Sequence, residues 1–439
     1  MSDREKRTPC LEHKENSVRT MGGIEASNSQ STMASTSQTS APPRGGDMAP
    51  RGPTTQQQQQ QKKKKEKEKK GKVGIRERIQ HFTFAWFLCT MSTGGLSIAL
   101  SETPHQFHGL HTMGLMLFCV NVGLFALLTG CMVARAMLYP GHVCKAVAHP
   151  GESFFVGSFW LSASVVVGGV QVYGITRGPG YRWLMDSVHV LYWVYAGVSL
   201  ANAVLQYFVL VWRSRVRPVP FTPSMFLPGY SAMLTGTLAS LIAPFQLPAR
   251  AYGVLLSGLA FQGLGWLISS VCMVYFVRLL LDQGFPPPAL RPALFIPVGS
   301  VAYTIVALVG LANAIPQEEG YFAAHAMAKE MCHVISLMVS VFLWLFSFWL
   351  FCIAVLGNLC ALKDMHFGLS WWAFIFPNVG FMLATNVLGQ ELQSQAILCI
   401  ASVLTISLVA VWLVATVACV RAVWKGDVVW PGKDEDKDV

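Results

Sequence analysis

Long apolar stretches constrain this chain more than any other feature of its sequence. A helix needs about 20 mostly apolar residues to cross a bilayer. Stretches of this kind occur at 82–101, 111–136, 153–174, 185–212, 224–243, 252–280, 293–314, 331–357, 368–388 and 396–424. Only 13% of the 439 residues are charged, whereas soluble proteins carry about 25%. The sequence therefore predicts an all-α integral membrane protein with ten transmembrane helices within residues 74–425. It argues against a soluble enzyme and a soluble nucleic-acid-binding domain.

The formal net charge of +10 is concentrated in an N-terminal tail. Residues 1–73 hold 15 Lys and Arg against 8 Asp and Glu, and they are rich in Ser, Thr, Gln, Pro and Gly. Such a composition buries too little apolar surface to fold, so we expect a disordered cytosolic tail. No apolar segment near Met1 has the pattern of a cleavable signal peptide. A short charged segment, 426–439, is expected to form a second cytosolic tail.

A lysine-rich run closes the N-terminal tail. Residues Lys62 to Lys72 contain 8 Lys and 2 Glu and lie shortly before the first apolar stretch. The run fits a solvated linker. It also fits a cytosolic clamp on anionic lipid, which is worth about 1 kcal/mol per Lys at the membrane surface. A nucleic-acid arm is disfavoured because no aromatic residues are interleaved for base stacking.

The positive-inside rule predicts the orientation of the helices. An even number of spans places both termini on one side of the membrane. If that side is the cytosol, the internal cytosolic loops carry eight basic residues, Arg135, Lys145, Arg213, Arg215, Arg217, Arg278, Arg291 and Lys363. The opposite loops carry four, Arg177, Arg182, Arg250 and Lys329. This bias agrees with the basic tail, so both termini are predicted to be cytosolic.

Cysteine and histidine give no sign of a metal or cofactor site. Most of the 11 Cys lie within apolar stretches and no CxxC pair occurs, which is typical of small buried hydrophobes. His105, His108 and His111 have a spacing that suits a metal, but no Cys or acidic residue completes a ligand set. We therefore expect neither a metal nor a cofactor.

The odd-numbered stretches carry small polar residues together with glycines or prolines. Examples are Thr90, Thr93, Gly94, Ser97, Ser158, Ser162, Ser231, Thr235, Ser300, Thr304, Pro377 and Asn378. One interpretation is an inner set of helices around a polar path. The other is close helix packing through small residues. Periodicity alone leaves both open.

Charged residues inside the apolar stretches are scarce. Glu152, Asp186 and Glu391 lie at or near the ends of stretches rather than in their middles. A pump with a buried proton relay usually has an acidic residue within the membrane. Hydroxyls and helix ends without fixed negative charge suit an anion better than a cation.

Six segments along the chain resemble one family. They are HFTFAWFLCTMSTGGLS (81–97), SAMLTGTLAS (231–240), FQGLG (261–265), RPALFIPVGSVAYT (291–304), FLWLFSFWLFCIAV (342–355) and WWAFIFPNVGFMLAT (371–385). Together they resemble the fungal malic acid and C4-dicarboxylate transporters of the tellurite-resistance/dicarboxylate transporter family. That family also includes fungal sulfite efflux pumps and plant slow anion channels. The resemblance covers residues 75–425.

The resemblance implies ten helices in five hairpins, with the odd-numbered helices lining a central pore and three chains forming a homotrimer. It also implies a phenylalanine that plugs the pore on the ninth helix, and Phe376 before Pro377 matches that position. A merely packed aromatic is the alternative. One departure is Gly299–Ser300–Val301, where the malate branch usually reads GPP after the valine.

Further candidate residues follow from position and chemistry. The expected substrate path includes Thr93, Thr235, Thr304 and Asn378. Arg78 and His81 precede the first stretch and can share a helix face. They fit a cytosolic mouth that attracts a carboxylate and titrates, or ordinary flanking charge. Arg291 fits either a bidentate carboxylate ligand or a topological anchor. Glu152 fits proton coupling or a favourable charge at a helix N-terminus.

These observations predict a plasma-membrane carrier for malate, succinate and fumarate. A dianion moving against 100 mV meets about 4.6 kcal/mol, so the carrier works by electrogenic export or by uptake linked to protons. The alternative on the same fold is an efflux transporter or channel for sulfite or another small anion. A membrane-tethered signalling protein that acts through its tail is a third class. No motif indicates an enzyme.

Overall fold

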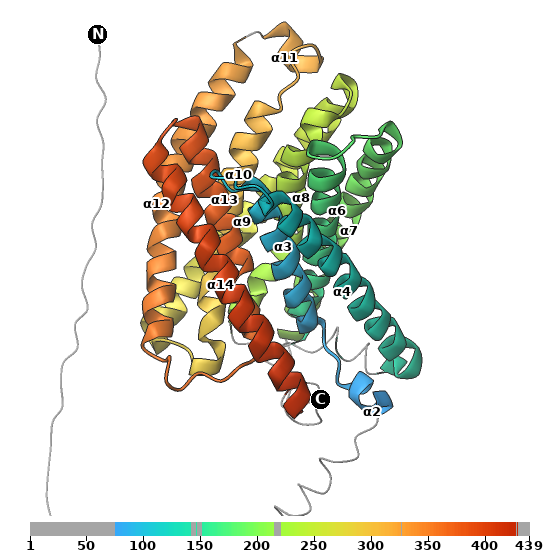
Figure 1. Ribbon diagram of the computed structural model, residues 1–439, viewed down its shortest axis with the longest axis vertical. Helices are drawn as coiled ribbons and strands as arrows, with labels where there is room; N and C mark the ends of the chain where they lie inside the picture. Colours follow the sequence, from blue (N-terminus) through green and yellow to red (C-terminus); the bar gives the residue numbers. More distant parts are fainter. Residues whose placement is uncertain are drawn as a thin grey trace, which may run out of the picture. The chain divides into compact units, whose positions relative to one another are not determined.

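The computed structural model describes residues 75–141, 146, 152–214, 221–325, 327–426 and 428. The predictions for the N-terminal tail, for Lys62 to Lys72 and for most of 426–439 fall outside these residues. Within them the chain is helical and has no strand. Ten of its helices are long and apolar enough to cross a membrane (Figure 1). The prediction of an all-α protein with ten candidate spans is confirmed.

The odd-numbered spans combine an α-helix with shorter helical segments. They are η1–α3 (Phe84–Trp86, Phe87–Glu102), η2–α6–η3 (Ser153–Phe155, Val156–Val170, Gln171–Thr176), η4–α8–η5 (Pro223–Phe226, Leu227–Ile242, Ala243–Phe245), η6–α10 (Pro288–Phe295, Ile296–Asn313) and η7–α13 (Leu369–Phe374, Phe376–Glu391). The even-numbered spans are the single helices α4 (Leu110–Leu138), α7 (Arg182–Ser214), α9 (Pro248–Gln283), α12 (Ala328–Leu359) and α14 (Gln395–Lys425). The short helices α2 (Ile75–Gln80) and α11 (Gly320–Ala324) lie outside the spans. Each span matches a predicted stretch to within a few residues.

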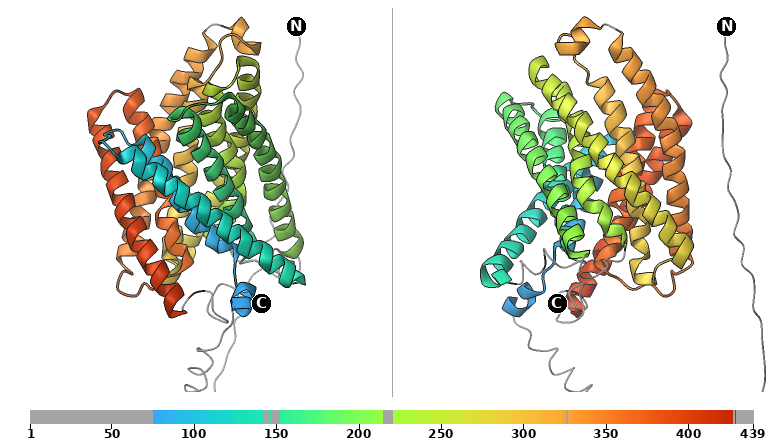
Figure 2. Two further views of the ribbon diagram at one scale, coloured as in Figure 1. Left: turned by 45° about the vertical axis from the view of Figure 1, so that its right-hand side comes forward. Right: turned by 180° about the vertical axis from the view of Figure 1, so that it is seen from behind.

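Burial divides the spans into two sets. In the most apolar window of each odd-numbered span, 83%, 50%, 94%, 89% and 89% of the residues are buried. In the even-numbered spans the shares are 22%, 33%, 28%, 28% and 17%. We call the first set the inner helices and the second the outer helices. Figure 2 shows the outer helices on both sides of the bundle.

The inner helices contact one another in a closed cycle. α3 packs on α6, α6 on α8, α8 on α10, α10 on α13, and α13 returns to α3. Each outer helix packs against the inner set: α4 on α3, α7 and α9 on α8, α12 on α10, and α14 on α13. The cycle surrounds a common axis, which is where a path through the molecule would have to run.

Every inner helix begins with a 3₁₀ segment, and no outer span does. These segments are η1, η2, η4, η6 and η7, and a proline lies in the first turn at Pro223, Pro228, Pro297 and Pro377. Proline fits there because its missing N–H has no intrahelical partner in the first turn. Neither the 3₁₀ segments nor η3, the π-helical segment that ends the third span, was predicted from the sequence.

Candidate functional site

Two cavities lie on the axis of the inner helices. The wide cavity, about 420 Å³, is lined by the starts of α3, α8, α10 and α13, by the end of α9 and by residues 284–290. The narrow cavity, about 50 Å³, is lined further along these inner helices, for example by Gly95, Ile98 and Leu383, and also by Gly168 of α6. Both linings are mainly apolar. Phe376 is the residue that belongs to both.

The Phe376 side chain is fixed between the two cavities. It is 3% exposed, and its ring stacks on Tyr303 with centroids 5.0 Å apart and an interplanar angle of 27°. The Tyr303 hydroxyl donates to the Phe376 carbonyl oxygen at 3.2 Å. On the other side, a Cβ at Gly95 would lie 3.0 Å from Cδ2 of the Phe376 ring. Glycine at position 95 therefore leaves room for the Phe376 ring between α3 and Tyr303.

Three of the expected path residues turn away from the axis. The Thr93 hydroxyl oxygen accepts a hydrogen bond from Nε1 of Trp412 on α14 at 3.1 Å. The Thr235 hydroxyl lies 3.0 Å from a serine hydroxyl of α7. Thr304 accepts from Nε2 of Gln262 on α9 at 2.9 Å. None of the three lines either cavity. These contacts favour helix packing, and a role in the path stays a prediction for these residues.

Two other residues with small hydroxyl side chains, Thr237 and Ser164, do line the narrow cavity. Thr237 donates to the Tyr303 carbonyl oxygen at 3.5 Å, and Ser164 donates to the Leu161 carbonyl oxygen at 2.8 Å. Thr237 lies two positions after Thr235, which is about 200° around a helix with 3.6 residues per turn. The sequence thus shows that Thr235 and Thr237 lie on opposite faces of α8. It does not show which of the two faces meets the axis.

Asn378 and Arg291 are held by backbone carbonyls. Nδ2 of Asn378 donates to the Phe374 carbonyl oxygen at 2.9 Å, and Asn378 lines neither cavity. The Arg291 guanidinium donates to the carbonyl oxygens of Pro286 at 3.0 Å and Gly357 at 2.7 Å. Arg291 therefore caps a carbonyl in the last turn of α12. This contact favours the interpretation of Arg291 as a structural anchor.

The two residues expected at the cytosolic mouth lie beside the bundle. Arg78 is in the last turn of α2, which packs against α4. His81 follows that helix, and its backbone N–H donates to the Arg78 carbonyl oxygen at 3.1 Å. Neither residue lines the wide cavity. Their roles in attracting substrate and in proton coupling stay predictions.

Glu152 forms a buried ion pair with Arg135. Nη1 of Arg135 lies 2.6 Å from Oε1 of Glu152, and the two side chains are 3% and 2% exposed. Arg135 was counted above with the loop charges, but it lies in α4 and is buried. The pair joins the end of α4 to the start of the third span. Because the Glu152 carboxylate is paired with the Arg135 guanidinium, Glu152 fits a structural role. Proton coupling at this residue stays a prediction.

The described residues contain no group of three or more His, Cys, Asp or Glu side chains that could hold a metal ion. Of the three histidines with metal-like spacing, His105 bonds to the Ser402 hydroxyl of α14 at 2.8 Å. His111 lies beside the Tyr173 ring, with centroids 5.5 Å apart. These two side chains therefore point to different neighbours rather than to a common centre.

Comparison with known proteins identifies the family. The model of the voltage-dependent anion channel family matches residues 81–420. The chain belongs to this family. It is 28% identical over 371 residues to a malic acid transport protein of Schizosaccharomyces pombe, which covers 84% of each chain. It is 27% identical over 327 residues to a sulfite efflux pump of Trichophyton rubrum, covering 72% of this chain and 84% of the pump. The resemblance inferred from the six segments is confirmed.

The family and the ten candidate spans together make this a multi-pass membrane protein of the anion transport class. The matched residues run from just before η1 almost to the end of α14, so they include all ten spans. The match therefore covers the whole cycle of inner helices and both axial cavities.

Proposed function

We propose that this protein transports C4-dicarboxylates, namely malate, succinate and fumarate, along the axis of its inner helices. Ten helices would form five hairpins, with the inner helices lining the pore and Phe376 closing it. The observation that carries the proposal is the meeting of two axial cavities at Phe376, in a chain similar over 84% of its length to a malic acid transport protein.

The lining of the path supports transport rather than tight binding. The described lining residues of the wide and the narrow cavity carry no charge. A charged solute leaves such a path readily, and an apolar constriction opposes its entry by dewetting. Because a dianion meets about 4.6 kcal/mol against 100 mV, inward movement requires a proton or a protonated substrate. Outward movement with a negative interior is driven by the potential.

A second candidate function is efflux of sulfite or another small anion. The narrow cavity of about 50 Å³ favours it, because such a volume accommodates only a few water-sized groups. Similarity to sulfite efflux pumps supports the same reading. The two candidates differ in substrate size and not in the path.

Flux measurements separate the candidates. The purified protein in liposomes, with the membrane potential clamped, should carry labelled malate, and excess succinate should inhibit that flux while sulfite leaves it unchanged. Sulfite flux without malate flux would instead establish the second candidate. Absence of malate flux at both polarities would overturn the dicarboxylate proposal.

The membrane context forms part of the same proposal. We place the protein in the plasma membrane with both termini cytosolic, as a homotrimer, with Lys62 to Lys72 on anionic lipid. The outer helices support assembly or lipid contact because they expose large apolar side chains such as Leu267 and Val274. Protease cleavage within residues 62–72 of the protein reconstituted into bilayers with and without phosphatidylserine tests the lipid contact, because binding to anionic lipid should slow the cleavage.

A further inference from the structure

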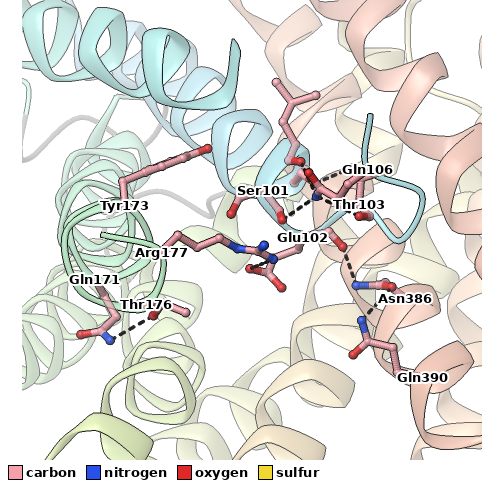
Figure 3. Close-up of polar contacts among 12 residues, drawn as sticks. Ser101, Glu102, Thr103, Gln106, Gln171, Tyr173, Thr176, Arg177, Asn386 and Gln390 are labelled. Atoms are coloured by element: carbon pink, nitrogen blue, oxygen red, sulfur yellow. Dashed lines mark hydrogen bonds and ion pairs between the residues drawn. The ribbon is translucent and has the colours of Figure 1, made fainter. Parts of the chain in front are cut away.

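A polar cluster lies at the end of the bundle opposite the wide cavity. Its centre is an ion pair between Glu102, the last residue of α3, and Arg177, which follows η3. Nη2 of Arg177 and Oε1 of Glu102 are 3.8 Å apart, and the side chains are 40% and 31% exposed. Figure 3 shows the pair between Gln171 on one side and Asn386 and Gln390 on the other. None of these residues lines the wide or the narrow cavity.

Helical spacing places this cluster on the continuation of the axial path. Gly95 and Ile98 line the narrow cavity, and Glu102 continues their face of α3 at the spacing i, i+3, i+7. On α13, Leu383 lines the same cavity, and Gln390 lies on its face seven positions later. The narrow cavity therefore leads toward Glu102 and Arg177.

The carbonyl oxygens at the end of α3 accept hydrogen bonds from side-chain amides, which reduces their repulsion of an anion. The last carbonyls of a helix form its negative end, which repels anions. Here Nε2 of Gln106 donates to the carbonyl oxygens of residues 100, 101 and 103 at 3.3, 2.9 and 2.9 Å. Nδ2 of Asn386 donates to the Glu102 carbonyl oxygen at 2.7 Å. Side-chain amides thus cover four carbonyls that would otherwise oppose an anion.

The ion pair itself is loose enough to exchange partners. At 3.8 Å the closest N–O distance is beyond that of a hydrogen bond, although a guanidinium can hold a carboxylate through two parallel bonds. The buried hydroxyl of Ser101 also makes no hydrogen bond within the described residues, and a hydroxyl can donate to a carboxylate. Arg177 and its surroundings therefore have unused capacity for a ligand.

We propose that Arg177 is the binding site for a substrate carboxylate at this mouth of the path, and that Glu102 occupies its guanidinium when substrate is absent. The inference rests on the proposed function, because it assigns a site to the same dicarboxylate substrate. A carboxylate that enters displaces Glu102 from Arg177 and then faces the narrow cavity. The exchange keeps the guanidinium paired in both states.

Sided kinetics test the proposal in liposomes with a single protein orientation. Arg177→Gln should raise KM for malate supplied at the Arg177 face by roughly tenfold, the value of one charge-assisted contact. KM for malate supplied at the opposite face should not change. Glu102→Gln should lower KM at the Arg177 face, because the competing carboxylate is gone. Arg182→Gln is the matched control: it removes an exposed charge five positions away and should leave KM unchanged.

The outcomes separate this inference from the proposed function. If wild-type protein carries malate but Arg177→Gln leaves KM unchanged, or shifts it equally at both faces, the site assignment is overturned. An equal shift in Arg182→Gln would overturn it as well. Wild-type protein without malate flux overturns both proposals. Arg177→Lys retains the positive charge but loses the paired N–H donors of the guanidinium. If Arg177→Gln does not fold, a KM rise in Arg177→Lys at the Arg177 face alone supports the site, and an unchanged KM overturns it.

Discussion

The inner and outer helices differ in a way that reverses the rule for soluble proteins. The outer helices bear the bulky apolar side chains and leave many of them exposed, including Leu267, Val274 and Phe342. The inner helices are more deeply buried, although many of their buried side chains, such as Thr90, Ser231 and Thr385, carry hydroxyls. Lipid tails are as apolar as a leucine side chain, so burying an apolar side chain gains little in a bilayer. Helix association is stabilised instead by small residues that let helices approach closely and by polar groups that form hydrogen bonds.

The inner helices satisfy their polar groups mostly within the bundle itself. Thr385 donates to the Phe381 carbonyl oxygen at 2.7 Å and Ser97 to the Gly94 carbonyl oxygen at 2.7 Å. Such local bonds leave few groups free to bind a substrate on the axis. Burial, and not hydroxyl content, therefore distinguishes the inner helices from the outer ones.

The largest effect on transport is expected at Phe376. Phe376→Ala should raise anion flux roughly tenfold, because removal of 1.4 kcal/mol from a barrier gives a factor of ten in rate. Electrical recording or labelled flux at a fixed protein-to-lipid ratio measures it. Phe342→Ala on the exposed face of α12 is the matched control and should leave flux unchanged. If both variants fold properly and show equal flux, Phe376 does not close the path.

The next effect concerns the buried ion pair. Glu152→Gln leaves Arg135 as an unpaired charge that is 3% exposed, so it should lower the free energy of unfolding by about 3 kcal/mol. Unfolding in detergent, followed by helix content, measures the change. The control is Asp282→Asn in the exposed Arg278–Asp282 pair of α9, whose side chains are 73% and 59% exposed. A comparable loss in that control would show that burial is not the cause.

A smaller effect distinguishes the two faces of a single outer helix. A Cβ at Gly265 of α9 would overlap Met233 of α8, whereas a Cβ at Gly263 would meet nothing within 4 Å. Gly265→Ala should therefore cost about 1–3 kcal/mol of stability through overpacking, and Gly263→Ala should be neutral or slightly stabilising. Thermal unfolding of both variants measures the difference. If both behave alike, the close α8–α9 contact is not a determinant of stability.

The candidate site was only partly predictable. Phe376 was found through the family resemblance, and its place between two cavities agrees with that expectation without testing its role. Thr93, Thr235 and Thr304 were chosen as small polar residues on inner helices, but a hydroxyl there serves packing as well as it serves a path. Arg177 was counted only as a loop charge, and its pairing with Glu102 was not predicted because the two residues lie at the ends of different spans, 75 positions apart in the sequence.

The sequence by itself determined the number, type and extent of the helices, because bilayer thickness sets how long an apolar stretch must be. It also determined the family, since six segments in order are more specific than any one of them. Only the tertiary structure decided which face of each inner helix meets the axis, that Arg135 pairs with Glu152, and that Glu102 meets Arg177. The physical reason is that the rotation of a helix about its own axis is set by side chains packed from distant segments, and sequence periodicity does not encode those contacts.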